Sequence, residues 1–594
     1  MRRGMAAIAA AATLLAAPAA ARAQEAPAKR PTATGTGGAA ATVDPYATAA
    51  AVEALRQGAN AVDAAVVAAG VLGVTEPYSC GIGGGGFMLV YRVGDRRVRA
   101  IDSREAAPDG FGPTSLIDPA TGQPIGFDEA VTSGLSVGVP GTVRGWDEAL
   151  RRYGTWGLSR ALQPGIDVAR RGFEVDQAFA DQTKTNLARF KAFPSTTELY
   201  VERDGTEPDP GDVLRNPDLA ATYGRIARLG PNGFYRGSVA QAIVGAVRRP
   251  PTAPGTTLKV RPGVMSGGDL ADYSAIVRRP TRIAYRGLDV YGAPPPSSGG
   301  STVGEILNIL EGYDLAGLGS REAALHRELE AERLAYADRA AFLGDPAFVD
   351  IPLLGLLSDG FAAARRALIG ERAATSARAG DPYAYWADPS PSGTGRPSVA
   401  VERSGSTTHL TVADRDGNVV SYTFTIEQTG GNGMVVPGLG FLLNNELTDF
   451  EFRPPAANAP EAAKRPRSSM APTIVLRGER PLLAVGSPGG ASIVTTVAQV
   501  LVDRLALGAT LPQAIAAPRV SQRNSATSQV EPAFLQTPEA AALTARGHRL
   551  AVTATSPEIG AATGIEFLGS GRLQAAAEPV RRGGGAAAVV RRSR

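Results

Sequence analysis

The sequence predicts a mixed α+β fold, and its length alone would allow several domains. Two strand-like runs, Thr407–Ala413 and Val419–Ile426, flank a short turn, and several apolar runs of helical length occur elsewhere in the chain. The 594 residues, 44% of them hydrophobic, are enough to bury a large core. This pattern shows that helices and strands occur together, but it does not order them into layers.

The first 42 residues precede the predicted core. Arg2 and Arg3, an apolar run, and the small-residue site ending at Ala23 are typical of a secretory signal peptide over residues 1–23. Residues 24–42, rich in Pro, Ala, Gly and Thr, are expected to form a flexible linker. No later stretch is apolar enough for a transmembrane helix, so we expect a secreted or periplasmic protein without a membrane span in its mature form.

Helical patterns and low-complexity stretches follow along the chain. We expect helices over Pro45–Gln57, Ala61–Leu72, Gly304–Leu310 and Arg321–Leu343. A stretch rich in Pro, Ser and Gly, from Gly380 to Ser406, is expected to be mobile. The arginine-rich and glycine-rich tail over residues 581–594 is expected to be disordered.

The turn between the two strand-like runs predicts their register. Asp414 at its start and Gly417 at a left-handed position suit a three-residue loop, which pairs Asp414 with Asn418. Thr407 then lies opposite Thr425, with both hydroxyls on one face of the sheet. A two-residue turn would instead move Thr425 to the other face.

A threonine at the start of a strand can act as a nucleophile if a base lies beside it. One such base is the threonine's own α-amine, whose pKa is roughly 7.7 to 8.0, once the residue is N-terminal. This requires cleavage of the Ser406–Thr407 bond, which the Thr407 hydroxyl can itself attack. A bare Thr-Thr pair is more often an ordinary part of a strand, so the rest of the chain has to support the nucleophile.

A glycine pair lies between a predicted strand and a predicted helix in PLLAVGSPGGASIVTTVAQVLVDRLALG. Backbone N–H groups near Gly489 and Gly490 therefore gather at a helix N-terminus, where they can stabilise an oxyanion. Without further context, a Gly-Gly pair is plain turn chemistry.

The motifs TTHLTVADRDGNVVSYTFTIEQTGGNG, GFLLNNELTDF and KRPRSSMAPTIV resemble the small subunit of γ-glutamyltranspeptidases, also called glutathione hydrolases. Upstream, GANAVDAAVVAAGVLGVTEP, GIGGGGFMLVY, SREAAP and PPPSSGG resemble the same family in its expected order. The resemblance covers most of residues 43–570. It implies a four-layer αββα sandwich of the N-terminal-nucleophile hydrolase type.

The resemblance also implies roles for particular residues. Thr407 matches the nucleophile, Thr425 the threonine that hydrogen-bonds to it, and the Ser406–Thr407 bond the site of autocatalytic cleavage. The remaining matches are Gly489 and Gly490 for the oxyanion hole, Arg104, Ser468 and Ser469 for the substrate's α-carboxylate, and Asp449, helped by Glu446, for its α-ammonium.

The implied protein is a zymogen that cleaves itself into a large subunit, residues 43–406, and a small subunit, residues 407–594, which associate as a heterodimer. The implied activity is that of a γ-glutamyltransferase or glutathione hydrolase. It cleaves γ-glutamyl amides through a γ-glutamyl-threonine ester and passes the γ-glutamyl group to water or to an amino acid or peptide acceptor. The sequence leaves open whether hydrolysis or transfer dominates.

Two positions depart from the family pattern. Glu427 stands where well-studied members have Asn, close to the expected α-amino pocket, so it is a further candidate for substrate binding. The segment between Asp449 and Ser468 is shorter than the lid-bearing version of some members, and we expect a more open pocket.

Several other classes of function are disfavoured. Gly81–Gly86 fits a dinucleotide-binding motif but precedes a strand-like run, and Ser136 fits a nucleophile-elbow motif without room for the required helix. His326, His409 and His548 lack metal-ligand spacing, and Cys80 is the only cysteine, so we expect neither a metal nor another cofactor. The net charge of +4 comes mainly from arginines at the two ends, without the basic stripe that nucleic-acid binding needs.

Two alternatives to the main hypothesis remain. One is a cephalosporin or glutaryl-type acylase on the same fold, although a glutaryl substrate would leave Asp449 without an ammonium partner. The other is a catalytically silent binding protein, which the retention of every nucleophile, oxyanion and carboxylate-binding position argues against.

Overall fold

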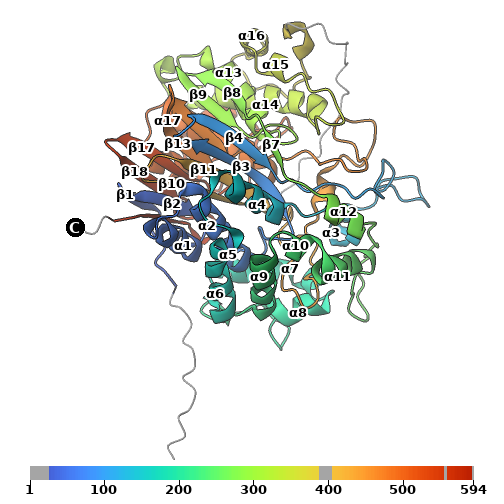
Figure 1. The fold of residues 1–594 in the computed structure, drawn as a ribbon. Coiled ribbons are helices and arrows are strands. Elements are labelled where there is room, and N and C mark those ends of the chain that lie inside the picture. The colour runs from blue at the N-terminus through green and yellow to red at the C-terminus, as the bar shows by residue number, and fades with distance from the viewer. Residues whose placement is uncertain (1–25, 387–404, 554–557, 592–594) are drawn as a thin grey trace, which may run out of the picture.

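The computed structural model describes residues 26–386, 405–553 and 558–591 (Figure 1). The predicted signal peptide and most of the stretch from Gly380 to Ser406 lie outside the described residues. Within the described residues, no helix is both long enough and apolar enough to cross a membrane.

Two seven-stranded sheets form the centre of the molecule. The first sheet has the order β1 (Thr32–Gly35), β18 (Arg572–Ala577), β17 (Thr563–Gly569), β13 (Arg480–Gly486), β12 (Thr473–Arg477), β9 (Leu288–Gly292) and β8 (Thr281–Tyr285). The second has the order β19 (Ala586–Val589), β2 (Gly38–Thr42), β10 (Thr408–Asp414), β11 (Val419–Thr425), β3 (Gly85–Arg92), β4 (Arg97–Asp102) and β7 (Ile276–Arg278). All neighbouring strands in both sheets are antiparallel.

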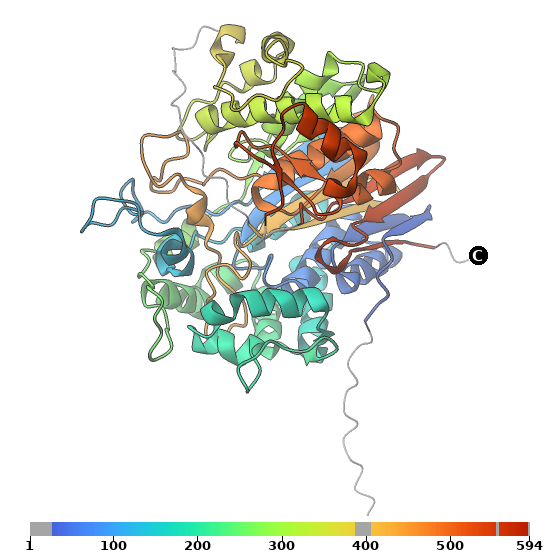
Figure 2. The same ribbon diagram turned by 180° about the vertical axis from the view of Figure 1, so that it is seen from behind.

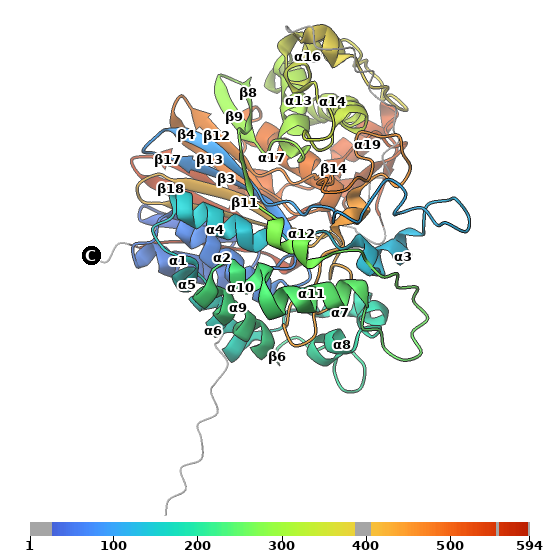
Figure 3. The same cartoon turned by 45° about the vertical axis from the view of Figure 1, so that its right-hand side comes forward.

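Helices cover the outer face of each sheet, as Figure 3 shows. On one side, α1 (Pro45–Arg56) and α2 (Ala61–Thr75) pack against β10 and β11 through an apolar cluster that includes Leu410 and Val420. On the other side, α13 (Gly299–Glu311), α14 (Arg321–Phe342) and α17 (Ile493–Leu505) pack against β9, β12 and β13. A third cluster, which includes Leu89 and Ile474, lies between the sheets. This arrangement confirms the αββα sandwich.

The four predicted helices are present; α1 and α14 each end one residue earlier than predicted, and α2 and α13 differ by more. Helix α2 continues three residues beyond the predicted Leu72, and every one of its residues is buried, because it lies between the sheet and the outer helices. Asn60 and Asp63 form a capping box that satisfies its first backbone N–H groups. Helix α13 begins at Gly299, five residues before the predicted start, because small residues there pack closely against the sheet.

The other helices form the outer layers and the lobe below α2 in Figure 1. They are α3 (Phe127–Thr132), α4 (Thr142–Tyr153), α5 (Leu158–Ala161), α6 (Gln163–Arg171), α7 (Gln177–Phe190), α8 (Pro194–Tyr200), α9 (Pro217–Leu229), α10 (Asn232–Tyr235), α11 (Gly237–Arg248), α12 (Gly267–Asp272), α15 (Leu353–Leu356), α16 (Asp359–Arg366), α18 (Leu511–Ala516) and α19 (Pro538–Ala545). Two small sheets contain β5 (Phe173–Glu174) with β6 (Val213–Leu214), and β14 (Val520–Ser521) with β15 (Ser528–Val530) and β16 (Leu550–Ala551).

Two expectations about the chain ends are wrong. Strands β1 and β2 occupy residues that we expected to belong to a flexible linker, and β2 is buried along its whole length. Strand β19 lies in the tail that we expected to be disordered, and it pairs with β2. Small residues such as Ala and Gly look like linker composition, but here they let strands pack tightly between layers.

Segments from both halves of the chain share each sheet. Figure 2 shows orange and red strands from beyond residue 407 side by side with blue strands from the N-terminal region. In the second sheet, β10 lies between β2 and β11, and β11 in turn pairs with β3. The core is therefore common to the parts before and after Thr407.

Candidate active site

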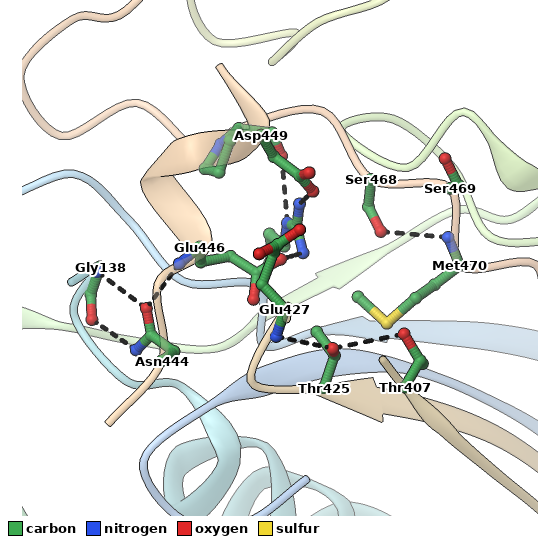
Figure 4. Close-up of polar contacts among 12 residues, drawn as sticks. Gly138, Thr407, Thr425, Glu427, Asn444, Glu446, Asp449, Ser468, Ser469 and Met470 are labelled. Atoms are coloured by element: carbon green, nitrogen blue, oxygen red, sulfur yellow. Dashed lines mark hydrogen bonds and ion pairs between the residues drawn. The ribbon is translucent and has the colours of Figure 1, made fainter. Parts of the chain in front are cut away.

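The register of the β10–β11 hairpin is the predicted one. Thr408 pairs with Phe424 and Ala413 with Val419, which places Thr407 opposite Thr425. The two hydroxyls meet at an Oγ1–Oγ1 distance of 3.3 Å, with Thr407 as the donor (Figure 4). Both side chains are buried.

Asp414 holds the turn that sets this register. Its Oδ1 accepts hydrogen bonds from the backbone N–H groups of Asp416 and Asn418, both at 3.0 Å, and Gly417 has φ +96°. Its Oδ2 accepts from the N–H of Ala61 at 3.0 Å, which ties the hairpin to the first turn of α2. One buried carboxylate thus links the hairpin to the central helix.

Thr425 connects the candidate nucleophile to the bond expected to be cut. Its Oγ1 donates to the Ser406 carbonyl at 2.6 Å and accepts from the N–H of Glu427 at 2.9 Å. Ser406 N–H in turn donates to the Glu427 carbonyl at 2.6 Å. The Ser406 carbonyl is therefore polarised by one threonine and lies next to the hydroxyl of the other.

A glycine run allows β3 to approach this hairpin closely. A Cβ atom on Gly84 would lie 1.9 Å from the carbonyl oxygen of Thr425, a distance that no side chain can occupy. Gly83 accepts a hydrogen bond from the Asn444 side chain at 2.7 Å. The glycine run Gly81–Gly86, which resembles a dinucleotide-binding motif in sequence, therefore allows close packing of the backbone beside Thr425.

A cavity of about 480 Å³ opens at Thr407. It brings together residues from distant parts of the sequence, as predicted, including Thr425, Glu427, Glu446 and Asp449. Ser468, Ser469, Gly490 and Arg104 also line it. Residues of the short segment after Asp449, among them Phe452 and Pro455, form one wall.

Arg104 lies at the base of this cavity and is 1% exposed. It follows β4, where its N–H donates to Asp102 Oδ1 at 2.9 Å. Its guanidinium pairs with Glu446 and, at 2.5 Å, with Asp449, and it also donates to the backbone carbonyl of Arg467 at 3.0 Å. The predicted carboxylate-binding arginine is thus held rigidly by the two predicted ammonium-binding acids.

Glu427 lies beside this group, with φ +78° in the left-handed region. Its carboxylate accepts hydrogen bonds from Asn445 Nδ2 at 2.6 Å, Gln428 Nε2 at 2.8 Å and Thr448 Oγ1 at 3.2 Å. A non-glycine residue in this conformation costs on the order of 1–3 kcal/mol and is found mostly at functional sites.

Burial and neighbouring negative charges raise the pKa of the acidic side chains around Arg104. Burial, with Asp449 and Glu446 nearby, raises the pKa of Glu427 well above its usual value. Burial also raises the pKa of Glu446 to about 7, although Arg104 opposes the shift. Burial and the neighbouring Glu446 raise the pKa of Glu105 as well. Several carboxyl groups here surround one guanidinium, which favours a ligand that brings a positive charge.

Ser468 and Ser469 also line the cavity. The Ser468 hydroxyl accepts from the N–H of Met470 at 3.1 Å, and the Ser469 hydroxyl accepts from Arg339 at 2.8 Å. Arg339 also donates to Ser298 at 2.8 Å. Sequence reasoning did not select Arg339, whose only signal is its place in the motif LAYADRAAFLGDP on α14.

Gly489 and Gly490 lie between β13 and α17, as the sequence predicts. They have φ values of +136° and +55° and lead through a short turn, Gly490–Ser492, into the helix. Positive φ at both positions explains the glycines, since other residues rarely adopt this conformation.

The remaining candidates are structural. His409 is buried and contacts the hydroxyls of Thr423 and Thr411 at 2.7 and 3.1 Å, and burial lowers its pKa to about 3. Ser136 donates to the carbonyl of Ser133 at 2.9 Å inside a short 3₁₀ turn, which excludes a nucleophile elbow. In the described part of the chain, no group of three or more His, Cys, Asp or Glu side chains is arranged to hold a metal ion.

Comparison with known proteins agrees with this geometry. The family model for gamma-glutamyltranspeptidase matches residues 47–588. The glutathione hydrolase proenzyme of Bacillus subtilis is 38% identical over 84% of this chain and 82% of its own length. The acylase ACY 1 proenzyme of a Pseudomonas species is 35% identical over 92% of this chain and 93% of its own length. The crystal structure of a cephalosporin acylase from Bacillus halodurans superposes with a TM-score of 0.83 at 28% identity, covering 98% of this chain and all of that one. The chain therefore belongs to the gamma-glutamyltranspeptidase family.

Proposed function

We propose that this protein is a self-processing γ-glutamyltransferase or glutathione hydrolase whose nucleophile is Thr407. The observation that carries the proposal is the position of Thr407, hydrogen-bonded to Thr425 and opening into the cavity that contains Arg104 and Asp449. Membership of the family and the similarity to glutathione hydrolase proenzymes support it.

Self-cleavage begins with attack by Thr407 Oγ1 on the Ser406 carbonyl carbon. A new C–O ester bond forms, the C–N bond to Thr407 breaks, and the hydroxyl proton passes to the departing nitrogen. The hydrogen bond from Thr425 to the carbonyl oxygen stabilises the charge that develops there. Water then hydrolyses the ester, which releases a carboxylate on Ser406 and leaves Thr407 with a free α-amine.

Turnover uses the same hydroxyl with the new amine as its base. Thr407 Oγ1 attacks the γ-amide of the donor, the α-amine accepts its proton, and the proton is returned to the departing amine of the donor. The resulting γ-glutamyl ester is released by water or by an acceptor amine. Gly489 and Gly490 are proposed to bind the oxyanion in both halves of the reaction.

The donor's α-amino acid end would occupy the polar base of the cavity. Its α-ammonium would lie among Asp449, Glu446 and Glu427, and its α-carboxylate near Arg104 and the two serines, Ser468 and Ser469. The pocket favours a donor that carries an ammonium group over one that lacks it, because several carboxyl groups share the single guanidinium of Arg104.

The two parts of the cleaved chain would remain associated, since both sheets contain strands from each. We further propose cleavage of residues 1–23 as a signal peptide and a secreted or periplasmic location. The large subunit would then begin close to β1, which is already part of the fold.

An acylase acting on glutaryl amides is the second candidate. Its support is the similarity to proteins named acylases, together with Glu427, whose carboxyl group holds its proton more strongly than usual and so requires less of a cationic partner. The glutaryl group lacks the α-amine, and this difference separates the two candidates.

The test compares release of an anilide from a γ-glutamyl anilide and from its glutaryl analogue by the processed protein. We expect the γ-glutamyl compound to react faster by about 2 kcal/mol or more, roughly thirtyfold in kcat/KM, because the analogue lacks the α-ammonium and the charged hydrogen bonds that it would donate to the carboxyl groups of the pocket. Preference for the glutaryl compound would make the protein an acylase. Thr407→Ala serves as the control, and a processed and active Thr407→Ala protein would refute the mechanism itself.

A further inference from the structure

The C-terminal turn places an arginine on the bond that is proposed to be cut. Arg582 Nη1 donates to the carbonyl oxygen of Thr407 at 2.6 Å, and its Nη2 donates to the hydroxyl of Ser406 at 2.9 Å. Nη2 also donates to the hydroxyl of Ser79 at 2.7 Å, and this hydroxyl lies 3.0 Å from that of Ser406. One guanidinium thus contacts the residues on both sides of the bond.

The backbone of Arg582 is fixed in an unusual conformation. It has φ +55° and ψ +36°, in the left-handed region that non-glycine residues rarely adopt. Its N–H donates to the Glu558 carboxylate at 2.9 Å, and β19 follows four residues later and pairs with β2. Since β2 is also the neighbour of β10, the C-terminal turn and Thr407 are held by the same sheet.

The contact between Arg582 and the Thr407 carbonyl does not depend on the bond that is cut. The carbonyl belongs to Thr407 and stays with it after cleavage, whereas the Ser406 hydroxyl belongs to the other product. Before cleavage the guanidinium holds both residues, and afterwards it holds the new chain terminus. This contact limits rotation of Thr407 about its own backbone bonds and so holds the Cα–Cβ bond from which the hydroxyl projects.

We propose that Arg582 is a positioning residue for Thr407, both in self-cleavage and in turnover, through its hydrogen bonds to the Thr407 carbonyl and the Ser406 hydroxyl. This inference rests on the proposed role of Thr407 as nucleophile. It assigns a task to a residue in the C-terminal tail, which no motif in the sequence marks.

The positive charge of Arg582 also affects the α-amine of Thr407, which is the proposed base after cleavage. Covalent geometry puts the Thr407 nitrogen within about 6 Å of the guanidinium, because N and O of one residue are separated by only three bonds. A like charge at this range favours the neutral amine, which is the form that accepts a proton. Among the described residues, the other charged groups near this position include the cavity acids Glu427, Glu446 and Asp449, the cavity base Arg104, Glu76 and Glu558 near the guanidinium, and the Lys29–Asp176 ion pair beside Gly583.

The experiment uses full-length protein with Arg582→Asn, Arg582→Gly and Arg582→Lys, and with Arg591→Gln as matched control. Asn and Gly suit the left-handed backbone, so both should fold while losing the charge. Arg591 is an exposed arginine of the same tail, and its replacement should change nothing. Self-cleavage is followed on denaturing gels after purification of the precursor, and kcat/KM is measured against pH for processed protein.

We expect Arg582→Asn and Arg582→Gly to cleave themselves at least about tenfold more slowly, as misplacement of a reacting group predicts. The acidic limb of their pH profile should move to higher pH, and Arg582→Lys should restore that limb because it restores the charge. Wild-type cleavage rates and an unshifted profile in Arg582→Asn would overturn the inference. Equal losses in all three variants together with a lowered Tm would also overturn it, in favour of a purely structural role.

The proposed function fails in a different way. If Thr407→Ala is cleaved and active, the nucleophile is wrong and both proposals fail. If Thr407→Ala is inert while the Arg582 variants behave as wild type, only the inference about Arg582 fails.

Discussion

At the residue scale, the site is dominated by carboxyl groups gathered around Arg104. Glu427 is the one that departs from the family pattern, and it is buried with three hydrogen-bond donors around it. Burial and the neighbouring acids raise its pKa nonetheless, so its ionisation in the folded protein is opposed. A group of this kind links the stability of the fold to pH.

Replacing Glu427 by Gln should change how stability depends on pH. An acid with a raised pKa binds its proton more tightly in the folded than in the unfolded protein, where its pKa is about 4.3. Tighter proton binding by Glu427 stabilises the folded protein fully below about pH 4.3. This stabilisation is lost as the pH rises toward the pKa of Glu427 in the folded protein, by up to about 1.4 kcal/mol per pH unit. Gln cannot titrate, so the Tm of Glu427→Gln relative to wild type should rise steadily with pH.

Measurement of Tm at intervals from pH 4 to pH 9 tests this expectation. Glu451→Gln, at the cavity wall, provides a comparison, because that carboxylate forms an ion pair with Arg467 at 3.1 Å. A Tm difference between Glu427→Gln and wild type that stays constant with pH would mean that Glu427 is ionised equally in both states.

The sequence predicts residues of the site well where they are local or part of a motif. Thr407 and Thr425 were placed opposite one another because a tight turn joins their strands. The ion pairs of Arg104 with Glu446 and Asp449 were not predicted, since more than 340 residues separate the partners. Arg339 and Arg582 were missed for the same reason, because contact across the sheets leaves no pattern in a single sequence.

At the element scale, the β10–β11 hairpin is the part of the fold that the site depends on most. Its register decides whether the two threonine hydroxyls share a face, and a shift of one residue would separate them. The Asp414 carboxylate sets this register through four hydrogen bonds, including one to Asn418 Nδ2 at 2.7 Å.

Asp414→Ala should therefore lower both stability and self-cleavage. The substitution leaves the buried N–H group of Ala61 without its acceptor, at a cost of about 1–3 kcal/mol, and it removes the acceptor of the two N–H groups in the turn. The expected result is a lower Tm by several degrees and slower cleavage of the precursor, measured by thermal unfolding and denaturing gels. Asp416→Ala, which removes an exposed carboxylate from the same turn, should have little effect on either.

The limits of element prediction are clearest where composition misleads. The β2 sequence GAAAT and the β19 sequence AAAV contain the residues of a linker or tail, yet both are strands. Helix α2 extends beyond its predicted end because burial on all sides removes the polar signal that would mark a boundary. Tertiary packing, which a local pattern does not contain, decided these cases.

At the scale of the whole molecule, the parts before and after Thr407 cannot be separated without opening both sheets. Strands β10 and β11, which follow Thr407, lie between two strands from the part before it. Strand β10 pairs with β2, and β11 pairs with β3. The two parts also share the apolar clusters on each side of the sandwich. The sandwich itself was predicted through the family resemblance, because the patterns of helix and strand do not specify layers.

Processed protein should therefore behave as one particle. We expect two chains on a denaturing gel and a single species in native size-exclusion chromatography, at concentrations far below those used for assays. Separation should require denaturant and should coincide with loss of secondary structure measured by circular dichroism. Dissociation into two folded halves before unfolding would contradict the shared core.

The pairing of β19 with β2 has a consequence for the order of events during synthesis. Arg582 lies 175 residues after Thr407 in the sequence, and the strand that pairs with β2 follows it, so both leave the ribosome long after the bond that is proposed to be cut. A chain that is halted before residue 582 lacks the arginine that is proposed to hold Thr407 in place. Under the role inferred for Arg582, the internal cut marks a polypeptide that has been translated at least as far as this turn and β19.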